Sequence, residues 1–547
     1  MSLKITELDD KLAAFWAKPS SPSRDGAAIL LTFAIGAIAM LTGAVHTRIF
    51  GHDIFIFLDA GWRVLNGQRP EIDFNPSMGP LLALLSAAGM KLARNSPDGI
   101  GIMRGMVAGI VGLWAYALVR KRMAFLPALL SAITLPLIAA APFPISWPPN
   151  ALSQAMVYNR FGYALLGLVV LECFQPGQGT LARGISTGVV SAGLLFLKPS
   201  YCLVALAFAA SSVWLGRMDV RRIFGIAFGF FAAGIAMMAY LRFDFAALWS
   251  DLQLMSAARG SLLSSWSIRW GFFKGAPDFL PLVLLAVLVS RLTATVRPLL
   301  VTALFWIGGA LLLATNGQLS GYPLNAVLAL ILIEQGRVAI GPDAKLCPRF
   351  LHAAAIIVLL GLVCWAPIAM SDASGLAYAF ADSRKVVPAS IARFEPPVLS
   401  RLIFYDVVDG TDADQRSNGA VYVNYINDGA RLIQRVSPAN ETVFTLDLTD
   451  PFPYALQRRP PRGGTPVLSL NHTFTDSRKP SPAWLFGSAD IVMVPKHPAS
   501  NEPDAQALFR NYLPGIRNEM ILCAESEWWE LYKWPSNRKG CTQATAR

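Results

Sequence analysis

Long apolar runs recur through the first 370 residues of the chain and constrain its fold more than any other feature. The first run, Ala27 to His46, has 20 residues, which is enough to cross a bilayer as one helix. Over the whole chain 54% of residues are apolar and 15% are charged, which excludes an ordinary soluble multidomain protein. Charged residues become frequent only after about residue 370, so the sequence predicts a membrane part followed by a soluble tail.

We predict an α-helical polytopic membrane protein with about eleven transmembrane helices and a C-terminal α/β soluble domain. Residues 1–26 contain Glu7, Asp9 and Asp10, so we interpret the first run as a retained anchor and not as a cleaved signal peptide. The apolar stretch 79–93 is short for a span and is predicted to lie along the membrane surface. The predicted spans are 27–47, 99–119, 124–142, 161–174, 184–197, 200–215, 223–241, 278–290, 298–315, 322–335 and 350–370.

Basic residues in the short connections determine the predicted orientation, because such residues gather on the cytoplasmic side. With a cytoplasmic N-terminus (residues 1–26), every short basic connection falls on the cytoplasmic side, and these connections also explain the net charge of +12. No lysine-rich tract or aromatic pattern predicts a nucleic-acid partner. An odd number of spans then places residues 371–547 on the outer side as a periplasmic domain. The basic connections include Arg120 to Arg122, Arg183, Arg217, Arg291 and Arg337.

The first outer loop, residues 48–98, begins with a predicted helix that Gly67 ends. Its apolar residues recur at helical spacing and form one stripe. Such a stripe suits a helix that lies flat on the bilayer with Trp62 at the interface. The stripe consists of Phe55, Leu58, Trp62 and Leu65.

Two aspartates of this helix are candidate catalytic residues. Asp53 stands at the helix start, where a carboxylate either caps the helix or acts as a base. Asp59 can pair with Arg63 at i+4, as a structural pair or as support for a site. The two aspartates lie about 120° apart around the helix, so we do not expect them to act together on one atom.

The segment HDIFIFLDAGWRVLNGQRP, followed by GPLLALL, resembles the first-loop pattern in mannosyltransferase branches of the C-type glycosyltransferase superfamily. The resemblance implies a multi-pass enzyme of the bacterial inner membrane that transfers a sugar from a polyprenyl-phosphate donor to an outward-facing glycan, lipid or protein acceptor. In that pattern an acidic residue just after the first span is catalytic, and Asp53 occupies the matching position. Asp59, Gly67 and Pro70 match later positions of the pattern.

One residue departs from the pattern. The eukaryotic branch has an acidic pair spaced D-x-D, and this chain has Gly51 at the first position of that pair. A single base is therefore predicted in place of a metal-binding pair. No cofactor or metal ligand set is predicted, and a divalent cation stays an open alternative.

A departing polyprenyl phosphate needs fixed positive charge near the outer membrane face. Lys198 lies between two apolar half-runs where Pro199 breaks the helix, and its amine either binds the phosphate or extends to the interface. Arg160 opens a span beside Tyr158 and Asn159, and its guanidinium either binds phosphate oxygens or anchors the span. These four polar residues are predicted to bind the substrate.

Two further outer connections carry weaker candidates. Arg269 lies among tryptophans in the connection 242–277, and the resemblance implies that such a loop covers the donor. Asn316 and Gln318 are interpreted as helix caps, with contact to sugar hydroxyls as the alternative.

The soluble tail alternates strand-like runs with predicted helices near 425–436 and 503–512, which indicates a small α/β domain. Cys523 and Cys541 can form a disulfide if this domain lies outside the cytoplasm. The strand-like runs are VFTLDL, DIVMVP, MILCAES and WWELYKW.

Two other classes of protein stay open. A transporter or flippase of lipid-linked glycans would show repeated halves with paired broken helices, and the sequence shows one broken region, around Lys198. A non-catalytic assembly protein of the cell envelope would use the soluble tail to bind its partners.

Overall fold

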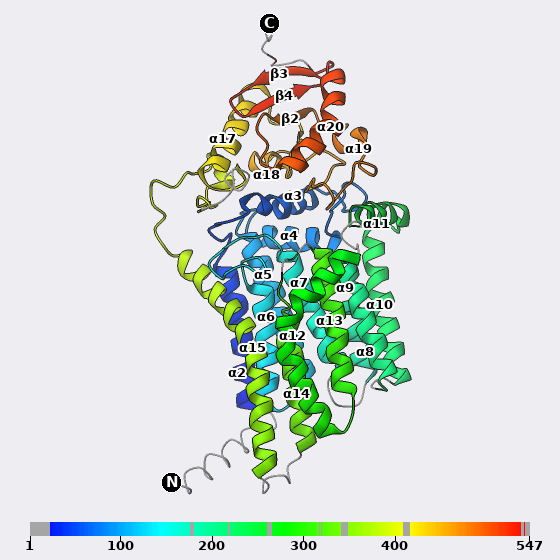
Figure 1. Ribbon diagram of the computed structural model, residues 1–547. Coiled ribbons are helices and arrows are strands. Elements are labelled where there is room, and N and C mark those ends of the chain that lie inside the picture. The colour runs from blue at the N-terminus through cyan, green and yellow to red at the C-terminus, as the bar shows by residue number, and fades with distance from the viewer. Residues whose placement is uncertain are drawn as a thin grey trace.

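The computed structural model describes residues 22–174, 180–216, 219–259, 265–316, 318, 320–340, 348–408, 416–537 and 541. These residues form a mostly helical protein with a small mixed four-stranded sheet in its C-terminal part. Figure 1 shows a bundle of long helices with the C-terminal domain covering one end.

Each predicted span coincides with a helix of the bundle. Seven helices of the described chain, α2, α5, α7, α10, α12, α13 and α15, are long and apolar enough to cross a membrane. The helices α6, α8 and α9 are apolar but shorter. The bundle helices are α2 (Pro22–Leu41), α5 (Gly99–Val119), α6 (Phe125–Ala140), α7 (Val157–Phe174), α8 (Leu181–Leu197), α9 (Pro199–Trp214), α10 (Val220–Tyr240), α12 (Ser265–Thr293), α13 (Arg297–Asn316), α14 (Leu324–Ile340) and α15 (Pro348–Asp382).

The last bundle helix changes the predicted domain boundary. Helix α15 continues to Asp382, so residue 371 lies inside a helix and does not begin the soluble domain. The segment that follows residue 371 contains LAYAF, which continues the apolar helical pattern. The first helix also differs, because α2 ends at Leu41 and the rest of the apolar run to His46 is not helical.

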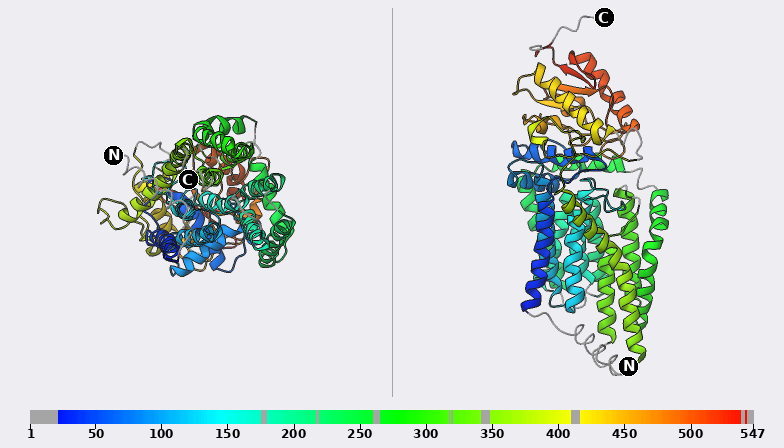
Figure 2. Two further views of the ribbon diagram at one scale, coloured as in Figure 1. Left: turned by 90° about the horizontal axis from the view of Figure 1, so that it is seen from below. Right: turned by 90° about the vertical axis from the view of Figure 1, so that its left-hand side faces the viewer.

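Two helices of residues 48–98, the predicted first outer loop, lie across the end of the bundle, beneath the C-terminal domain (Figures 1 and 2). These are α3 (Ile54–Leu65), which follows the 3-10 turn η1 (Gly51–Asp53), and α4 (Pro80–Leu92). Helix α4 occupies the stretch predicted to lie along the membrane surface.

The environment of α3 differs from the prediction. All residues of α3 from Ile54 to Arg63 are buried. The indole Nε1 of Trp62 donates to the carbonyl of Arg458 at 2.8 Å, and its ring meets Tyr454 edge to face. The stripe therefore packs against protein and not against lipid, because the C-terminal domain covers this helix.

The C-terminal domain is an α/β fold, and its predicted strands and helices are confirmed. The strand order is β1-β2-β4-β3, with β1 and β2 parallel and the other two neighbouring pairs antiparallel. Helix α17 follows the N-terminal loop of the domain and packs on β4 through Tyr425 and Trp529. The elements are η3 (Pro397–Leu399), α17 (Gly419–Val436), β1 (Val443–Thr445), α18 (Phe452–Ala455), α19 (Pro482–Phe486), β2 (Ile491–Pro495), α20 (Glu502–Glu519), β3 (Ile521–Glu525) and β4 (Trp529–Lys533).

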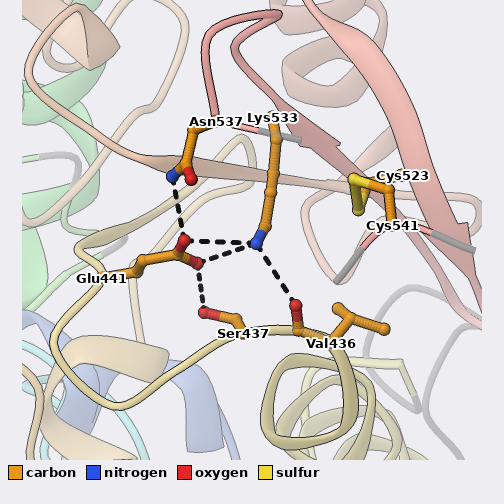
Figure 3. Close-up of a disulfide and its surroundings, with 7 residues drawn as sticks. All are labelled: Val436, Ser437, Glu441, Cys523, Lys533, Asn537 and Cys541. Atoms are coloured by element: carbon orange, nitrogen blue, oxygen red, sulfur yellow. Dashed lines mark hydrogen bonds and ion pairs between the residues drawn. A yellow bond between two sulfur atoms is a disulfide. The ribbon is translucent and has the colours of Figure 1, made fainter. Parts of the chain in front are cut away.

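A buried ion pair and a disulfide hold the edge of this domain together (Figure 3). The Lys533 amine lies 2.9 Å from a Glu441 carboxylate oxygen, and Ser437 and Asn537 donate to the same carboxylate. Burial alone would raise the pKa of Glu441, but these hydrogen bonds hold that pKa below its ordinary value. Cys523 and Cys541 form the disulfide that the sequence allowed.

Helices α8 and α10 pack through glycines at close range. A side chain at Gly184 or Gly188 of α8 would meet the backbone of Arg222 or Ile226 on α10. Gly225 and Gly229 of α10 face α8 in the same way. Two small residues four positions apart on each helix let the backbones approach, as in membrane helix pairs generally.

We predict that Gly188→Ala lowers the thermal stability of the purified protein. The new methyl group would meet the Ile226 carbonyl, and overpacking of this kind costs about 1–3 kcal/mol. The measurement is the melting temperature in detergent. The matched control is Gly234→Ala on α10, where an added methyl group meets no atom within 4 Å. Equal melting temperatures for the two variants would contradict the close packing.

Loss of the disulfide is expected to destabilise the C-terminal domain by about 3 kcal/mol, because the bond, which joins residues 18 positions apart, restricts the unfolded chain. The measurement is urea denaturation followed by tryptophan fluorescence, with Cys541→Ser compared with the wild type. A reducing agent should bring the wild type to the midpoint of the variant and leave the variant unchanged. A wild-type midpoint that does not respond to reduction would argue against a bonded pair.

Candidate functional site

The helix break predicted at Lys198 forms the centre of the candidate site. Helix α8 ends at Leu197 and α9 begins at Pro199, with Lys198 in extended conformation between them. Proline is tolerated at the first position of a helix because that position needs no backbone donor. Gly79, at φ +90°, brings the start of α4 against the carbonyls of Phe196 and Leu197. The break therefore lies at the bundle end beneath the C-terminal domain.

Three of the predicted substrate-binding residues meet at this break. The Lys198 amine donates to the side-chain oxygen of Asn159 at 3.2 Å and lies 5.0 Å from the ring centre of Tyr158. It also donates to the side-chain oxygen of Asn316 at 2.6 Å. Lys198 is 4% exposed, so the charge is held inside the protein and not at its surface.

Further amide and hydroxyl groups extend this arrangement into a network, which we call the Lys198 cluster. Asn316 donates to the hydroxyl of Tyr201 at 2.9 Å and to Gln318 at 3.1 Å, and Tyr163 donates to Gln318 at 2.8 Å. Asn316 and Gln318 thus take part in a buried network, where the sequence suggested helix caps or sugar contacts. The Lys198 cluster consists of Tyr158, Asn159, Tyr163, Lys198, Tyr201, Asn316 and Gln318.

Two donors of the Lys198 cluster lack acceptors among the described residues. These are the side-chain nitrogens of Asn159 and Gln318, which are buried without a hydrogen-bond partner. An unsatisfied buried donor costs about 1–3 kcal/mol, so an oxygen-rich ligand would stabilise this arrangement. A charged amine beside two open amide donors is the set of groups that a phosphate or sugar would require.

Arg160 lies one residue from Asn159 but points elsewhere. Its guanidinium pairs with Asp372 of α15 at 2.9 Å and donates to the carbonyls of Phe143 and Ile138. Its ring contact is with Phe143, at 4.4 Å from the ring centre. These partners join α7 to α6 and α15, so we leave Arg160 out of the proposed phosphate site.

Arg269 does not lie in a loop. The predicted connection 242–277 contains α11 (Phe245–Arg259) and the beginning of α12, with residues 260–264 outside the described chain. Arg269 is exposed on the first turns of α12. No described contact joins Arg269 to Lys198, and its role in covering a donor stays a prediction.

Asp53 has a different environment from the one that capping predicts. Within the described chain its side chain accepts no capping hydrogen bond from α3. One carboxylate oxygen lies 3.0 Å from Nε2 of His52. Burial lowers the pKa of His52, but the Asp53 carboxylate and further acceptors outweigh it, and the pKa is raised overall. The raised pKa favours a protonated His52 imidazole beside the Asp53 carboxylate.

The C-terminal domain borders the Asp53–His52 pair. The backbone amide of His52 donates to the carbonyl of Ser417 at 3.1 Å. A side chain at Gly51 would meet Phe404 and Asn418, which explains why the first D-x-D position cannot hold an aspartate here. Asp53 is 23% exposed at the side chain, so it stays accessible.

Asp59 lies in a fully buried charge cluster. Its carboxylate pairs with Arg63 at 2.8 Å, as the i, i+4 spacing predicts. The same guanidinium lies 3.7 Å from Asp450 of the C-terminal domain, and none of the three side chains is more than 2% exposed. Burial, together with the Asp59 carboxylate, raises the pKa of Asp450 well above its ordinary value. This environment suits a structural link between domains.

A second carboxyl pair was not predicted from the sequence. Glu71 and Asp251 are hydrogen-bonded to each other, and Asn75 donates to Asp251 at 2.8 Å. Burial raises the pKa of Asp251 to about 6 and that of Glu71 well above its ordinary value. Leu248, one turn before Asp251, packs against the cluster of Phe196, Met238 and Leu241, which places the pair toward the helix break at Lys198.

The described residues contain no group of three or more His, Cys, Asp or Glu side chains that could hold a metal ion. Comparison of the chain with protein-family models, with curated proteins and with solved structures found no match.

We predict that Asp251→Asn is more stable than the wild type above pH 6. The folded protein favours protonated Asp251, so ionising it lowers stability as the pH rises from the unfolded pKa near 4 to the folded pKa near 6. The variant avoids that loss, and at pH 4 the advantage should vanish. Melting temperatures between pH 4 and pH 8 measure it. Asp244→Asn, which removes a capping carboxylate on the same connection, is the control. A stability difference between Asp251→Asn and the wild type that does not change with pH would contradict the raised pKa of Asp251.

Proposed function

We propose that this protein is a membrane glycosyltransferase that moves one sugar from a polyprenyl-phosphate donor to an acceptor hydroxyl. The observation that carries the proposal is the Lys198 cluster, where a buried amine, two amides and a tyrosine ring meet at a helix break. A bilayer protein tolerates a buried charge and a broken helix mainly where a ligand or a polar network uses them.

The proposed step is a single displacement. Asp53, supported by His52, takes the proton of the acceptor hydroxyl while the hydroxyl oxygen forms a bond to the anomeric carbon. The bond from that carbon to the phosphate oxygen breaks, and the electron pair leaves with the polyprenyl phosphate. The Lys198 amine stabilises the developing charge. One displacement inverts the configuration at the sugar carbon.

The proposed location is the bacterial inner membrane, with the C-terminal domain and the Lys198 cluster on the periplasmic side. The basic connections at the other end of the bundle support this orientation. The disulfide in the C-terminal domain supports it as well, because such bonds persist outside the cytoplasm. The acceptor would be a glycan, lipid or protein of the cell envelope.

The carboxyl pair suggests a second candidate for the base. Leu248, one turn before Asp251, packs against the cluster that contains Phe196 beside the helix break, whereas no described contact joins Asp53 to the Lys198 cluster. The base must lie close to the sugar carbon while the phosphate contacts Lys198. An activity assay can decide which carboxylate meets that requirement.

The test uses purified full-length protein in detergent with labelled polyprenyl-phosphate sugars and extracted envelope glycans. We expect Lys198→Met to raise the apparent donor KM at least tenfold, since a charged hydrogen bond is lost. Lys91→Met, which removes an exposed amine at the end of α4, is the matched control. Unchanged donor affinity in Lys198→Met would remove the phosphate site.

The base is tested in the same assay. Asp53→Asn should lower kcat by about 10²–10⁴-fold with the fold intact, and Asp244→Asn should not. Activity that survives in Asp53→Asn but is lost in Asp251→Asn would move the base to Asp251. Flipping of labelled lipid across vesicles without any sugar transfer would favour a transporter and end the proposal.

A further inference from the structure

A cationic cluster lies at the last turn of α15, apart from the Lys198 cluster. Asp382 is almost fully buried, and three basic groups approach its carboxylate at 3.2 Å each. These are the ring of His46, the guanidinium of Arg48 and the amine of Lys385. Among the described contacts of these groups, Asp382 is the one carboxylate, so the cluster carries more positive than negative charge.

Aromatic rings hold these cations in place. The Arg48 guanidinium lies 4.4 Å from the ring centre of Tyr405 and 5.5 Å from that of Tyr378. The Lys385 amine lies over the same Tyr378 ring at 5.5 Å. The side chains of Arg48 and Lys385 are 31% and 58% exposed, so both can reach a ligand from outside.

The position of this cluster points to a lipid. Asp382 ends a helix that is long and apolar enough to cross a membrane, so the cluster lies at the level of headgroups. Below it, α15 exposes Ala377 and Met370, which fall on one face at helical spacing and lie within about one leaflet of Asp382. Next to Lys385, the side chain of Val386 is 94% exposed.

The cations also lie at the unexpected end of the bundle. Basic residues of membrane proteins collect on the cytoplasmic side, and here the basic connections lie at the other end of the bundle. Arg48 and Lys385 instead lie beside the C-terminal domain, where a lipid phosphate would account for them. A guanidinium and an amine beside aromatic rings form a suitable set of donors for that group.

We propose that Arg48 and Lys385 bind the phosphate of an anionic phospholipid in the leaflet on the side of the C-terminal domain, with the acyl chains along α15. Arg48 supplies a fork of donors, and Lys385 closes the site from the exposed side. Asp382 and the tyrosines keep both cations oriented. The site is independent of sugar transfer.

Native mass spectrometry of the full-length protein in detergent, titrated with phosphatidylglycerol, tests the proposal. The double variant Arg48→Gln, Lys385→Gln should bind the first phosphatidylglycerol about tenfold more weakly than the wild type. The matched control is Arg242→Gln, Lys91→Gln, which removes two exposed charges from the same end of the bundle. Equal weakening in both double variants would show general charge attraction and overturn the site.

Two further arms identify the ligand. Phosphatidylcholine should bind the wild type more weakly than phosphatidylglycerol, and inorganic phosphate should displace neither lipid at millimolar concentration. Displacement by inorganic phosphate would instead indicate a site for a soluble anion and overturn the lipid assignment. If the double variant does not fold, Lys385→Gln alone is informative, because its side chain is more than half exposed.

Discussion

The buried guanidinium of Arg63 determines how helix α3 and the C-terminal domain fit together. Its Nε pairs with Asp59 on the same helix, and its Nη1 donates to the carbonyls of Pro461 and Gly463. A charge without exposure is stable only when its neighbours satisfy its hydrogen bonds, and removing one partner of such a group costs about 3–5 kcal/mol. Asp59 belongs to α3, whereas Pro461 and Gly463 belong to the C-terminal domain. This one side chain therefore connects α3 to residues 461–463 and so positions Asp53.

The helix break at Lys198 follows from a second constraint. Backbone groups freed by a break at membrane depth must find partners inside the protein. The backbone amide of Lys198 still bonds to Leu194 of α8, and that of Tyr201 bonds back to Lys198, so the break leaves few groups open. The amine then points toward α7 and α13 because Asn159 and Asn316 offer oxygens there. The break and the polar network therefore depend on each other.

Much of this arrangement could be predicted from the sequence, because the signals are local. Apolar runs locate the bundle helices, and alternating strand-like runs locate the sheet. Lys198 next to a proline, and Tyr158 with Asn159 at the start of a span, mark the same end of two helices, which is why they meet. The apolar stripe of α3 was also visible, but a stripe cannot tell lipid from a covering domain. Its burial depends on residues about 400 positions away.

The remaining contacts are set by long-range packing that no local pattern reveals. Arg160 contacts Asp372 and not the Lys198 cluster because α15, which lies about 200 residues later in the sequence, brings Asp372 within reach of α7. Glu71 meets Asp251 because α11 lies against the first loop, and neither residue stands in a recognisable motif. The sequence reveals residues such as Lys198, whose position in a broken span is itself unusual. It does not reveal residues such as Glu71, whose environment is set by a partner that is distant in the sequence.

The exposure of the cations distinguishes the two anion sites. Lys198 is 4% exposed, so its charge has already lost its hydration and interacts strongly with any anion that enters. Arg48 and Lys385 keep much of their hydration, so an anion at their site gains less from each contact. A reacting phosphate needs the first environment, where developing charge is stabilised without solvent. A lipid headgroup that only has to stay in place is served by the second. This difference in burial is why we propose chemistry at the Lys198 cluster and lipid binding at Arg48 and Lys385.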